Sequence, residues 1–394
     1  MSKAVITGYA RTPFVRFTGA FASIPGTELG AHAVRAALAR AGVAPDRVQR
    51  VFGGQVLQGL AGQNPARQAG VGAGMPFTVP AITLNAVCLS GLEAVAAGAA
   101  LIEAGGADVV VAVGMESMSL APHAFPARAG TRYGAIELVD TLDHDGLTDA
   151  YEHVSMGSST EVGNDALHLD RAAQDAWAAR SHQRAAASRG FLAGEIEPFE
   201  VPGRRGATLV AEDDGVRPET TVDTLAALRP SFRPEGTITA GNASQITDGA
   251  AALVLMSEEA AAASGATPIA RILASALVAG PDIQLHHQPS NAILAALATL
   301  DADVSALARV EINEAFASVA LASVEALGVD PGIVNVHGGA IALGHPIGAS
   351  GARLAGTVAR QLHEPGAVSG VARLGAAALC GGGGQGSALI LEAV

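Results

Sequence analysis

The chain has 394 residues, enough for two or three domains, and its composition excludes several classes of protein. Hydrophobic residues make up 49% of it and charged residues 15%, which excludes a disordered protein. The formal net charge of −13 argues against nucleic-acid binding, and no apolar run reaches the roughly 18 residues of a membrane-spanning helix. The first residues enter a strand pattern without the features of a signal peptide, so we expect a cytoplasmic protein.

Strand and helix patterns alternate through the first 118 residues. Apolar runs predict strands, while longer periodic or Ala-rich stretches that end at glycine predict helices. We predict strands at residues 4–8, 51–57, 81–87 and 108–113, with helices at 28–41, 65–73 and 89–104.

The last third of the chain repeats this order of elements. We predict strands at residues 271–278, 310–313, 333–336, 372–379 and 387–391, with helices at 291–300, 314–327 and 349–361. Near-continuous apolar strands joined by helices indicate sheets that are covered on both faces. The repeat therefore predicts two α/β halves related by a pseudo-twofold axis.

One strand of the first half is displaced along the chain. The second half ends in a fifth strand, and its counterpart, Ala-Ala-Leu-Val-Leu-Met, comes only at residues 251–256. The intervening segment is rich in scattered Pro, Arg, His and Asp and has one clear helix at 171–188. We predict an N-terminal half formed by residues 1–118 and 246–267, an inserted lid domain at 119–245, and a C-terminal half at 268–394.

Cys88 lies between the third predicted strand and the helix that follows it. Ligands bind at such junctions in open α/β sheets. Unpaired N–H groups and the positive end of the helix dipole stabilise a thiolate, so we expect a lowered pKa and a nucleophilic sulfur. A cysteine that is simply buried in the core is the alternative.

His345 occupies the corresponding junction of the second half, within a glycine-rich segment. If the two halves are related by pseudo-twofold symmetry, the helix starts that bear Cys88 and His345 face each other. The imidazole could then serve as the base for the thiol. A histidine that only holds a loop is the alternative, but flanking glycines let the backbone come close to a ligand.

Two further polar groups reach the same rim of the predicted sheets. Cys380 precedes four consecutive glycines, and backbone N–H donors beside a thiol suit oxyanion stabilisation next to a proton acceptor; a flexible turn is the alternative. Asn313 could hold a water or donate to a carbonyl oxygen, whereas a helix N-cap is the alternative. Two thiols, an imidazole and a carboxamide suggest acyl transfer through a thioester, and we predict no metal site.

Six motifs, in order along nearly the whole chain, resemble signatures of the thiolase family. They are Asn85-x-x-Cys88-x-Ser90-Gly91, Gly114-Met115-Glu116-Ser117-Met118, Gly241-Asn242-Ala243-Ser244, Asn313-Glu314-Ala315-Phe316, Gly344-His345-Pro346-x-Gly348-x-Ser350-Gly351 and Cys380-x-Gly382. The resemblance implies the thiolase fold, with two βαβαβαββ halves packed as five layers and an inserted loop domain. It also implies an acyltransferase whose substrates are coenzyme A thioesters and which requires no separate cofactor.

The resemblance implies a ping-pong mechanism. Cys88 would carry the acyl group as a thioester, and His345 would activate Cys88 and donate to the thioester oxygen of the second substrate. Asn313 would position a water at that oxygen. Cys380 would take the α-proton of acetyl-CoA, while the N–H groups of Cys88 and Gly382 would form the other oxyanion hole.

Coenzyme A would lie against the inserted segment. By their place in the family pattern we expect contacts from Arg217, Ser244, Ala240, Leu147, Met156, Thr224, Phe232 and Phe316. Arg217 would meet the adenine or phosphate end, and in so acidic a protein it would act at short range. Residues 128–133 resemble the loop through which bacterial members associate, which implies a homotetramer.

Two segments depart from the family pattern beside the acyl pocket. Ser155 stands where thiolases with short acyl substrates usually have a histidine, and residues 283–289 replace the family's Met-Gly-x-Gly-Pro segment. We predict condensation of two acetyl-CoA or cleavage of acetoacetyl-CoA in lipid metabolism. The alternatives are a 3-ketoacyl-CoA thiolase for longer or branched chains and, from another class, a non-catalytic acyl-CoA or lipid carrier. A β-ketoacyl synthase fits less well, since such sites use two histidines with the cysteine.

Overall fold

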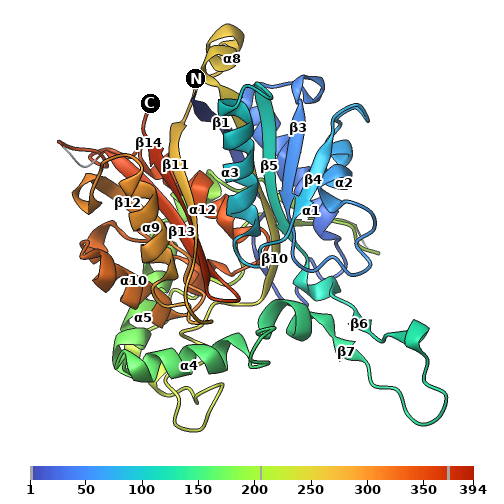
Figure 1. The fold of residues 1–394 in the computed structure, drawn as a ribbon, viewed down its shortest axis with the longest axis vertical. Coiled ribbons are helices and arrows are strands. Elements are labelled where there is room, and N and C mark those ends of the chain that lie inside the picture. Colours follow the sequence, from blue (N-terminus) through green and yellow to red (C-terminus); the bar gives the residue numbers. More distant parts are fainter. Residues whose placement is uncertain (1–2, 205, 371–372) are drawn as a thin grey trace.

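The computed structural model describes residues 3–204, 206–370 and 373–394, and a ten-stranded mixed sheet forms its centre (Figure 1). The strand order is β12-β13-β14-β11-β1-β10-β5-β3-β4, and the short β2 (Val15–Arg16) pairs with β10. The N-terminal half contributes β1 (Ala4–Arg11), β3 (Arg50–Gly54), β4 (Ala81–Leu84), β5 (Val109–Glu116) and β10 (Thr247–Ser257). The C-terminal half contributes β11 (Ala270–Ala279), β12 (Leu307–Ile312), β13 (Leu374–Gly381) and β14 (Gln385–Glu392).

Helices cover both faces of each half of the sheet, as the apolar strands predict. The outer helices of the N-terminal half are α1 (Gly26–Ala41) and α2 (Pro65–Gly72), and those of the C-terminal half are α9 (Gln288–Ala298) and α10 (Ala317–Leu327). Between the two halves lie α3 (Ser90–Glu103) and α12 (Ser350–Gln361), which pack against each other. The result is five layers: outer helices, the N-terminal half of the sheet, the central helices, the C-terminal half of the sheet, and outer helices again (Figure 1).

Small residues allow α3 and α12 to cross at close range. A Cβ atom on Gly91 would lie 2.7 Å from the carbonyl oxygen of Gly348, and one on Gly351 would lie 2.7 Å from Cβ of Leu92. Real side chains do not approach so closely, so only glycine fits at this crossing. The starts of the two helices therefore face each other, as the pseudo-twofold repeat predicts.

The strand predicted at residues 333–336 is wrong. A 3-10 helix, η6 (Pro331–Ile333), stands there instead, and only an isolated bridge joins Val334 to Val310 of β12. The side chain of Asn335 takes the place of a neighbouring strand: its Oδ1 accepts from Ile312 N and its Nδ2 donates to Ile312 O, both at 2.9 Å. At this edge of β12 the side chain of Asn335 thus satisfies the backbone N–H and C=O groups of Ile312.

The segment between β5 and β10 contains more regular structure than the one helix expected. Besides α5 (Arg171–Ala187) it forms a π-helix, η4 (Leu142–Leu147), and the helices α4 (Met156–Ala166), α6 (Arg189–Ala193) and α7 (Val222–Ala226). The hairpin of β6 (His123–Ala124) and β7 (Val139–Asp140) projects away from the body (Figure 1). The limits of the three predicted parts of the chain stay a prediction.

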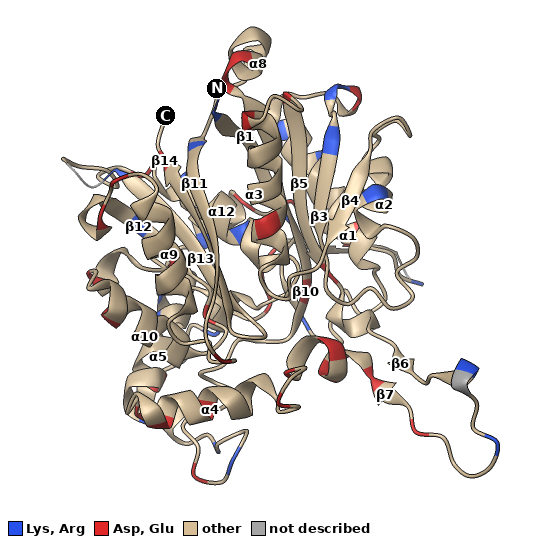
Figure 2. Cartoon of the chain, viewed as in Figure 1, with Lys and Arg blue, Asp and Glu red and all other residues tan. Residues whose placement is uncertain are grey.

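Charged side chains are few along the central strands and are spread over the periphery of the molecule (Figure 2). In the part of the chain that the structure describes, no helix is both long enough and apolar enough to cross a membrane.

Candidate active site

A strained turn presents Cys88 between β4 and α3. The preceding residue, Val87, has a φ of 52°, a left-handed conformation that a β-branched side chain rarely adopts. Two side chains hold this turn: Asn85 Oδ1 accepts from Val87 N at 2.9 Å, and Ser90 Oγ donates to Val87 O at 2.6 Å. Strain of this kind persists where surrounding bonds over-determine the backbone, often at functional sites.

Burial controls the acidity of the Cys88 thiol. The residue is partly exposed, but the protein surrounds the sulfur closely enough that burial raises its pKa to about 11. The backbone N–H groups of Gly382 and of Cys88 itself face the thiol and act in the opposite direction, while Glu116 raises the pKa further. The expected lowering of this pKa is therefore wrong for the free protein, because burial outweighs the N–H groups. Cys88 is a neutral thiol at pH 7 and needs a base to react.

Hydrogen bonds fix the neutral tautomer of His345. Ser350 Oγ donates to Pro346 O at 3.0 Å, so its single proton is used there. Both contacts of the hydroxyl are satisfied when His345 Nδ1–H donates to it, at 2.6 Å. Burial lowers the pKa of His345 to about 3, with a smaller contribution from Arg353. At neutral pH His345 is therefore a neutral imidazole whose Nε2 carries the acceptor lone pair.

Asn313 lies beside that lone pair. Its Nδ2 is 3.4 Å from His345 Nε2, and its Oδ1 is buried without a hydrogen-bond partner among the described residues. Asn313 is not the N-cap of α10, since that position belongs to Phe316. The amide therefore has one unused acceptor next to the imidazole, which could accept a hydrogen bond from a water.

A buried carboxylate ties the His345 loop to the N-terminal half. Glu116 accepts from Gly348 N at 2.9 Å, from Val56 N at 3.0 Å and from Leu57 N at 3.1 Å. Burial raises the pKa of Glu116 to about 7, and these three N–H groups limit the rise. Neither Glu116 nor Ser350 was predicted as a site residue, although both belong to the motifs quoted above.

Gln245 anchors the same loop from the other side, and nothing in the sequence singled it out. Its backbone oxygen accepts from His345 N at 3.0 Å. Its side-chain Nε2 donates to Ile341 O at 2.9 Å and to Gly215 O at 3.1 Å. Only the folded chain brings these distant segments together.

Cys380 lies at the end of β13 and is buried. Burial raises the pKa of its thiol, and the neighbouring Cys88 raises it further, so the two sulfurs are close enough to interact electrostatically. The glycine run after Cys380 forms the tight turn between β13 and β14, with positive φ at Gly383 and Gly384. The turn also carries the Gly382 N–H that faces Cys88.

A cavity of about 240 Å³ opens beside His345. Its walls include five of the residues predicted to contact coenzyme A: Leu147, Met156, Phe232, Ser244 and Phe316. The rings of Phe232 and Phe316 meet edge to face, with centroids 6.1 Å apart. Met156 and Phe316 also pack against Cys380, which connects the cavity to the second thiol.

Three other predicted contacts lie outside this lining. Arg217 and Ala240 are exposed on loops. Thr224 is exposed in the first turn of α7, where its side chain forms a capping box with Thr221. These residues could meet only the part of a ligand that leaves the cavity.

The two departures from the family pattern have structural roles. Ser155 caps α4 by accepting from Ser158 N at 3.1 Å. In the segment 283–289, Leu285 packs in the same cluster as Cys380 and Phe316. A leucine, rather than a polar group, thus borders the second thiol.

The arrangement suits acyl transfer. The two thiols and two N–H donors lie together, and the neutral imidazole of His345 borders the cavity that leads to Cys380. Such a set can form a thioester, stabilise its oxyanion and move a proton.

Comparisons with known proteins agree with this fold. The family model for the thiolase N-terminal domain matches residues 4–259, and that for the thiolase C-terminal domain matches residues 266–393. The chain therefore belongs to the thiolase family.

Individual relatives match over their full length. The chain is 51% identical to a probable acetyl-CoA acetyltransferase of Mycolicibacterium smegmatis, over 98% of this chain and 100% of that protein. It is 45% identical to the acetyl-CoA acetyltransferase of Shinella zoogloeoides, over 99% of each. The crystal structure of the Bacillus anthracis acetyl-CoA acetyltransferase has a TM-score of 0.95 at 37% identity, and it covers 100% of this chain and 99% of that one.

Proposed function

We propose that this thiolase is an acetyl-CoA C-acetyltransferase, which condenses two acetyl-CoA molecules or cleaves acetoacetyl-CoA with coenzyme A. The observation that supports the proposal is that Met156 and Phe316 line the cavity beside His345 and also pack with Cys380, whose thiol interacts electrostatically with Cys88. The relatives named above support the acetyl group as the unit transferred. The substrates would be coenzyme A thioesters, with no separate cofactor.

In the first half-reaction Cys88 would attack the acyl carbonyl carbon. As the new S–C bond forms, the thiol proton would pass to His345 Nε2, and the bond to the sulfur of coenzyme A would break. The leaving thiolate would take a proton from solvent, and His345 would keep the proton on Nε2. The N–H groups of Cys88 and Gly382 would hold the oxyanion, and each such donor is worth about 3–4 kcal/mol in comparable sites.

In the second half-reaction Cys380, after giving its own proton to solvent, would act as a thiolate and remove the α-proton of acetyl-CoA. The resulting carbanion would attack the acetyl carbon on Cys88, a C–C bond would form, and the Cys88 S–C bond would break. The Cys88 thiolate would then recover the proton from His345 Nε2. His345 and the water held by Asn313 would stabilise the enolate oxygen. Thiolysis is the same sequence in reverse.

Coenzyme A would enter along the cavity next to His345. Leu147, Met156, Phe232, Ser244 and Phe316, which line it, would contact the pantetheine. Arg217, Thr224 and Ala240 are exposed, so we assign them to the nucleotide end outside the cavity. Homotetramer assembly, a cytoplasmic location and a role in lipid metabolism stay predictions.

A thiolase for longer or branched chains is not favoured, given the names of the relatives. A comparison of turnover with acetoacetyl-CoA and with 3-ketoacyl-CoA of increasing chain length tests the proposal. We expect acetoacetyl-CoA to have the highest kcat/KM and the Cys88→Ala variant to be inactive but folded. A strong preference for long chains, or full activity of that variant, would contradict the proposal.

A further inference from the structure

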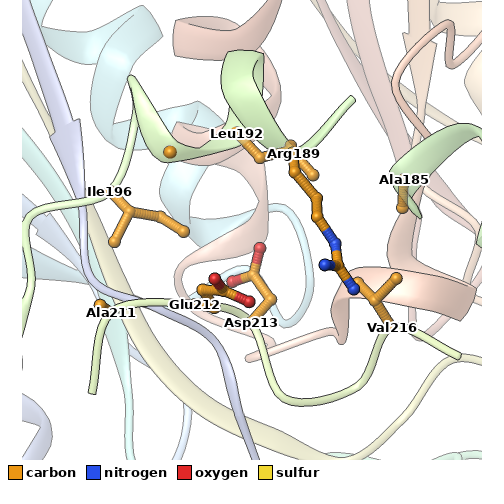
Figure 3. Close-up of a pocket in the computed structure, with 9 residues that line it drawn as sticks. Ala185, Arg189, Leu192, Ile196, Ala211, Glu212, Asp213 and Val216 are labelled. Atoms are coloured by element: carbon orange, nitrogen blue, oxygen red, sulfur yellow. The ribbon is translucent and has the colours of Figure 1, made fainter. Parts of the chain in front are cut away.

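A second pocket lies behind the loop that carries His345. It is bounded by α6 and the end of α5 on one side and by residues 211–216 on the other (Figure 3). It is lined by Ala185, Arg189, Leu192, Ala193, Ile196, Ala211, Glu212, Asp213 and Val216. None of these residues lines the cavity beside His345, so the two spaces are distinct.

The floor of this pocket is apolar and well packed. Ala185 and Leu192 are buried in one cluster with Ala342 and Leu343, and Val216 packs against it. Ala342 and Leu343 lie just before the Gly344-His345 motif in the chain. An apolar group that enters the pocket would therefore rest on residues that support the catalytic loop.

Two exposed charges of opposite sign border this floor. Arg189 and Glu212 are both exposed, and no hydrogen bond or ion pair joins either side chain to another described residue. Asp213 differs, because Arg11 holds it in a two-pronged ion pair at 2.6 and 2.8 Å. In Figure 3 the side chain of Arg189 reaches down from α6, and Glu212 lies on the opposing loop.

This charge pattern selects the kind of ligand. A simple anion would be attracted by Arg189 but repelled by Glu212. A simple cation would be attracted by Glu212 but repelled by Arg189. A neutral apolar molecule would remove water from both charges without replacing it. A zwitterion could satisfy both at once through charge-assisted hydrogen bonds.

The size of the pocket narrows the class further. Its volume is about 100 Å³. A cavity of about 150 Å³ holds benzene, which has six heavy atoms, so a pocket of this volume holds roughly four. The branched aliphatic side chain of an α-amino acid such as leucine has this size, and its charged groups would then lie at the exposed rim, beside Arg189 and Glu212.

We propose that this pocket binds a free aliphatic α-amino acid such as leucine. The carboxylate pairs with Arg189, the ammonium group pairs with Glu212, and the side chain packs on Leu192 and Val216. For a ligand of this size we expect a Kd on the order of 1 mM. The site is separate from the acyl-transfer site and does not depend on the identity of its substrates.

Isothermal titration calorimetry of the full chain with L-leucine tests the proposal. We expect binding of L-leucine, and binding weaker by about tenfold or more for 4-methylpentanoate and 3-methylbutylamine, which each lack one charge. Arg189→Gln and Glu212→Gln should weaken leucine binding to a similar extent. The control Arg47→Gln removes an exposed arginine far from the pocket in sequence, in a 3-10 helix, and should leave the affinity unchanged.

Excess coenzyme A added to the calorimeter cell should not displace leucine, since the two cavities share no lining residue. The absence of binding up to about 20 mM L-leucine would overturn the proposal. It would also be overturned if the two singly charged analogues bound as tightly as L-leucine, or if the two pocket variants bound L-leucine as tightly as the control variant does. Displacement of L-leucine by coenzyme A would overturn it as well. All three substituted residues are exposed, so loss of folding does not confuse the result.

Discussion

His345 Nδ1 lies 2.6 Å from Ser350 Oγ, and this contact determines which ring nitrogen can act as a base. The hydroxyl also contacts Pro346 O, and both contacts are satisfied when it donates to that carbonyl and accepts from the imidazole. In this tautomer the proton is on Nδ1, and Nε2 is the ring nitrogen that can accept one.

Ser350→Ala should therefore lower kcat while the fold is retained. Without the acceptor, the imidazole loses its fixed tautomer and one hydrogen bond to its protonated form, worth about 1.5–3 kcal/mol. We expect kcat for acetoacetyl-CoA thiolysis to fall by roughly 10–100-fold. The control Ser264→Ala, on the exposed side of α8 (Glu258–Ser264), should keep full activity. Equal activity of the two variants would contradict the assigned tautomer.

Gly351→Ala should destabilise the contact of the two halves. The added Cβ would lie 2.3 Å from the backbone N of Leu92 in α3 and 2.7 Å from the Cβ of the same residue. Overpacking of this kind costs about 1–3 kcal/mol in the free energy of unfolding. The matched control Gly190→Ala, in α6, meets no atom within 4 Å and should be neutral or stabilising by up to about 1 kcal/mol. Chemical denaturation of both variants measures the difference.

His286→Gln should make the protein less sensitive to acid. Burial lowers the pKa of His286 from 6.5 to about 4, so the unfolded chain takes up the proton first as the pH falls. The wild type should lose about 1.4 kcal/mol per pH unit relative to the variant between about pH 6 and pH 4. Glutamine can still donate to Asn164 Oδ1, as His286 Nε2 does at 2.8 Å. Parallel stability curves for the two proteins over this range would contradict the cause given for the shift.

Cys380→Ser should separate the two half-reactions. The serine hydroxyl is too weak an acid to lose its own proton and then act as the base. Cys88 remains in place to form the acyl-enzyme. We expect the variant to become acylated but not to exchange the α-protons of acetyl-CoA with deuterium in solvent, followed by NMR. Exchange at the wild-type rate would contradict the proposed role of Cys380.

Local signals in the sequence were sufficient to predict much of the fold. Gly42 and Gly328 end α1 and α10 with φ of 65° and 64°, and both ends were predicted from glycine alone. The order of strands and helices, repeated in the two halves, placed Cys88 and His345 at facing helix starts. The fold class and the family assignment are confirmed.

Features that depend on distant contacts could not be predicted in this way. Residues 333–336 have the composition of a strand, but Asn335 supplies the edge of β12 with an amide instead. The acidity of Cys88 depends on how much water the folded chain removes, which no local pattern reports. Gln245 acts through carbonyl groups of residues about 30 and 100 positions away, so its type and spacing carry no signal.

The central claim is that Cys88, rather than Cys380, carries the acyl group while the two thiols share one site. Incubation with acetoacetyl-CoA in the absence of free coenzyme A, followed by proteolysis and mass spectrometry, tests it most directly. We predict an acetyl group on the peptide that contains Cys88 and none on the peptide that contains Cys380. An acetyl group on Cys380, or on neither cysteine, would contradict the account.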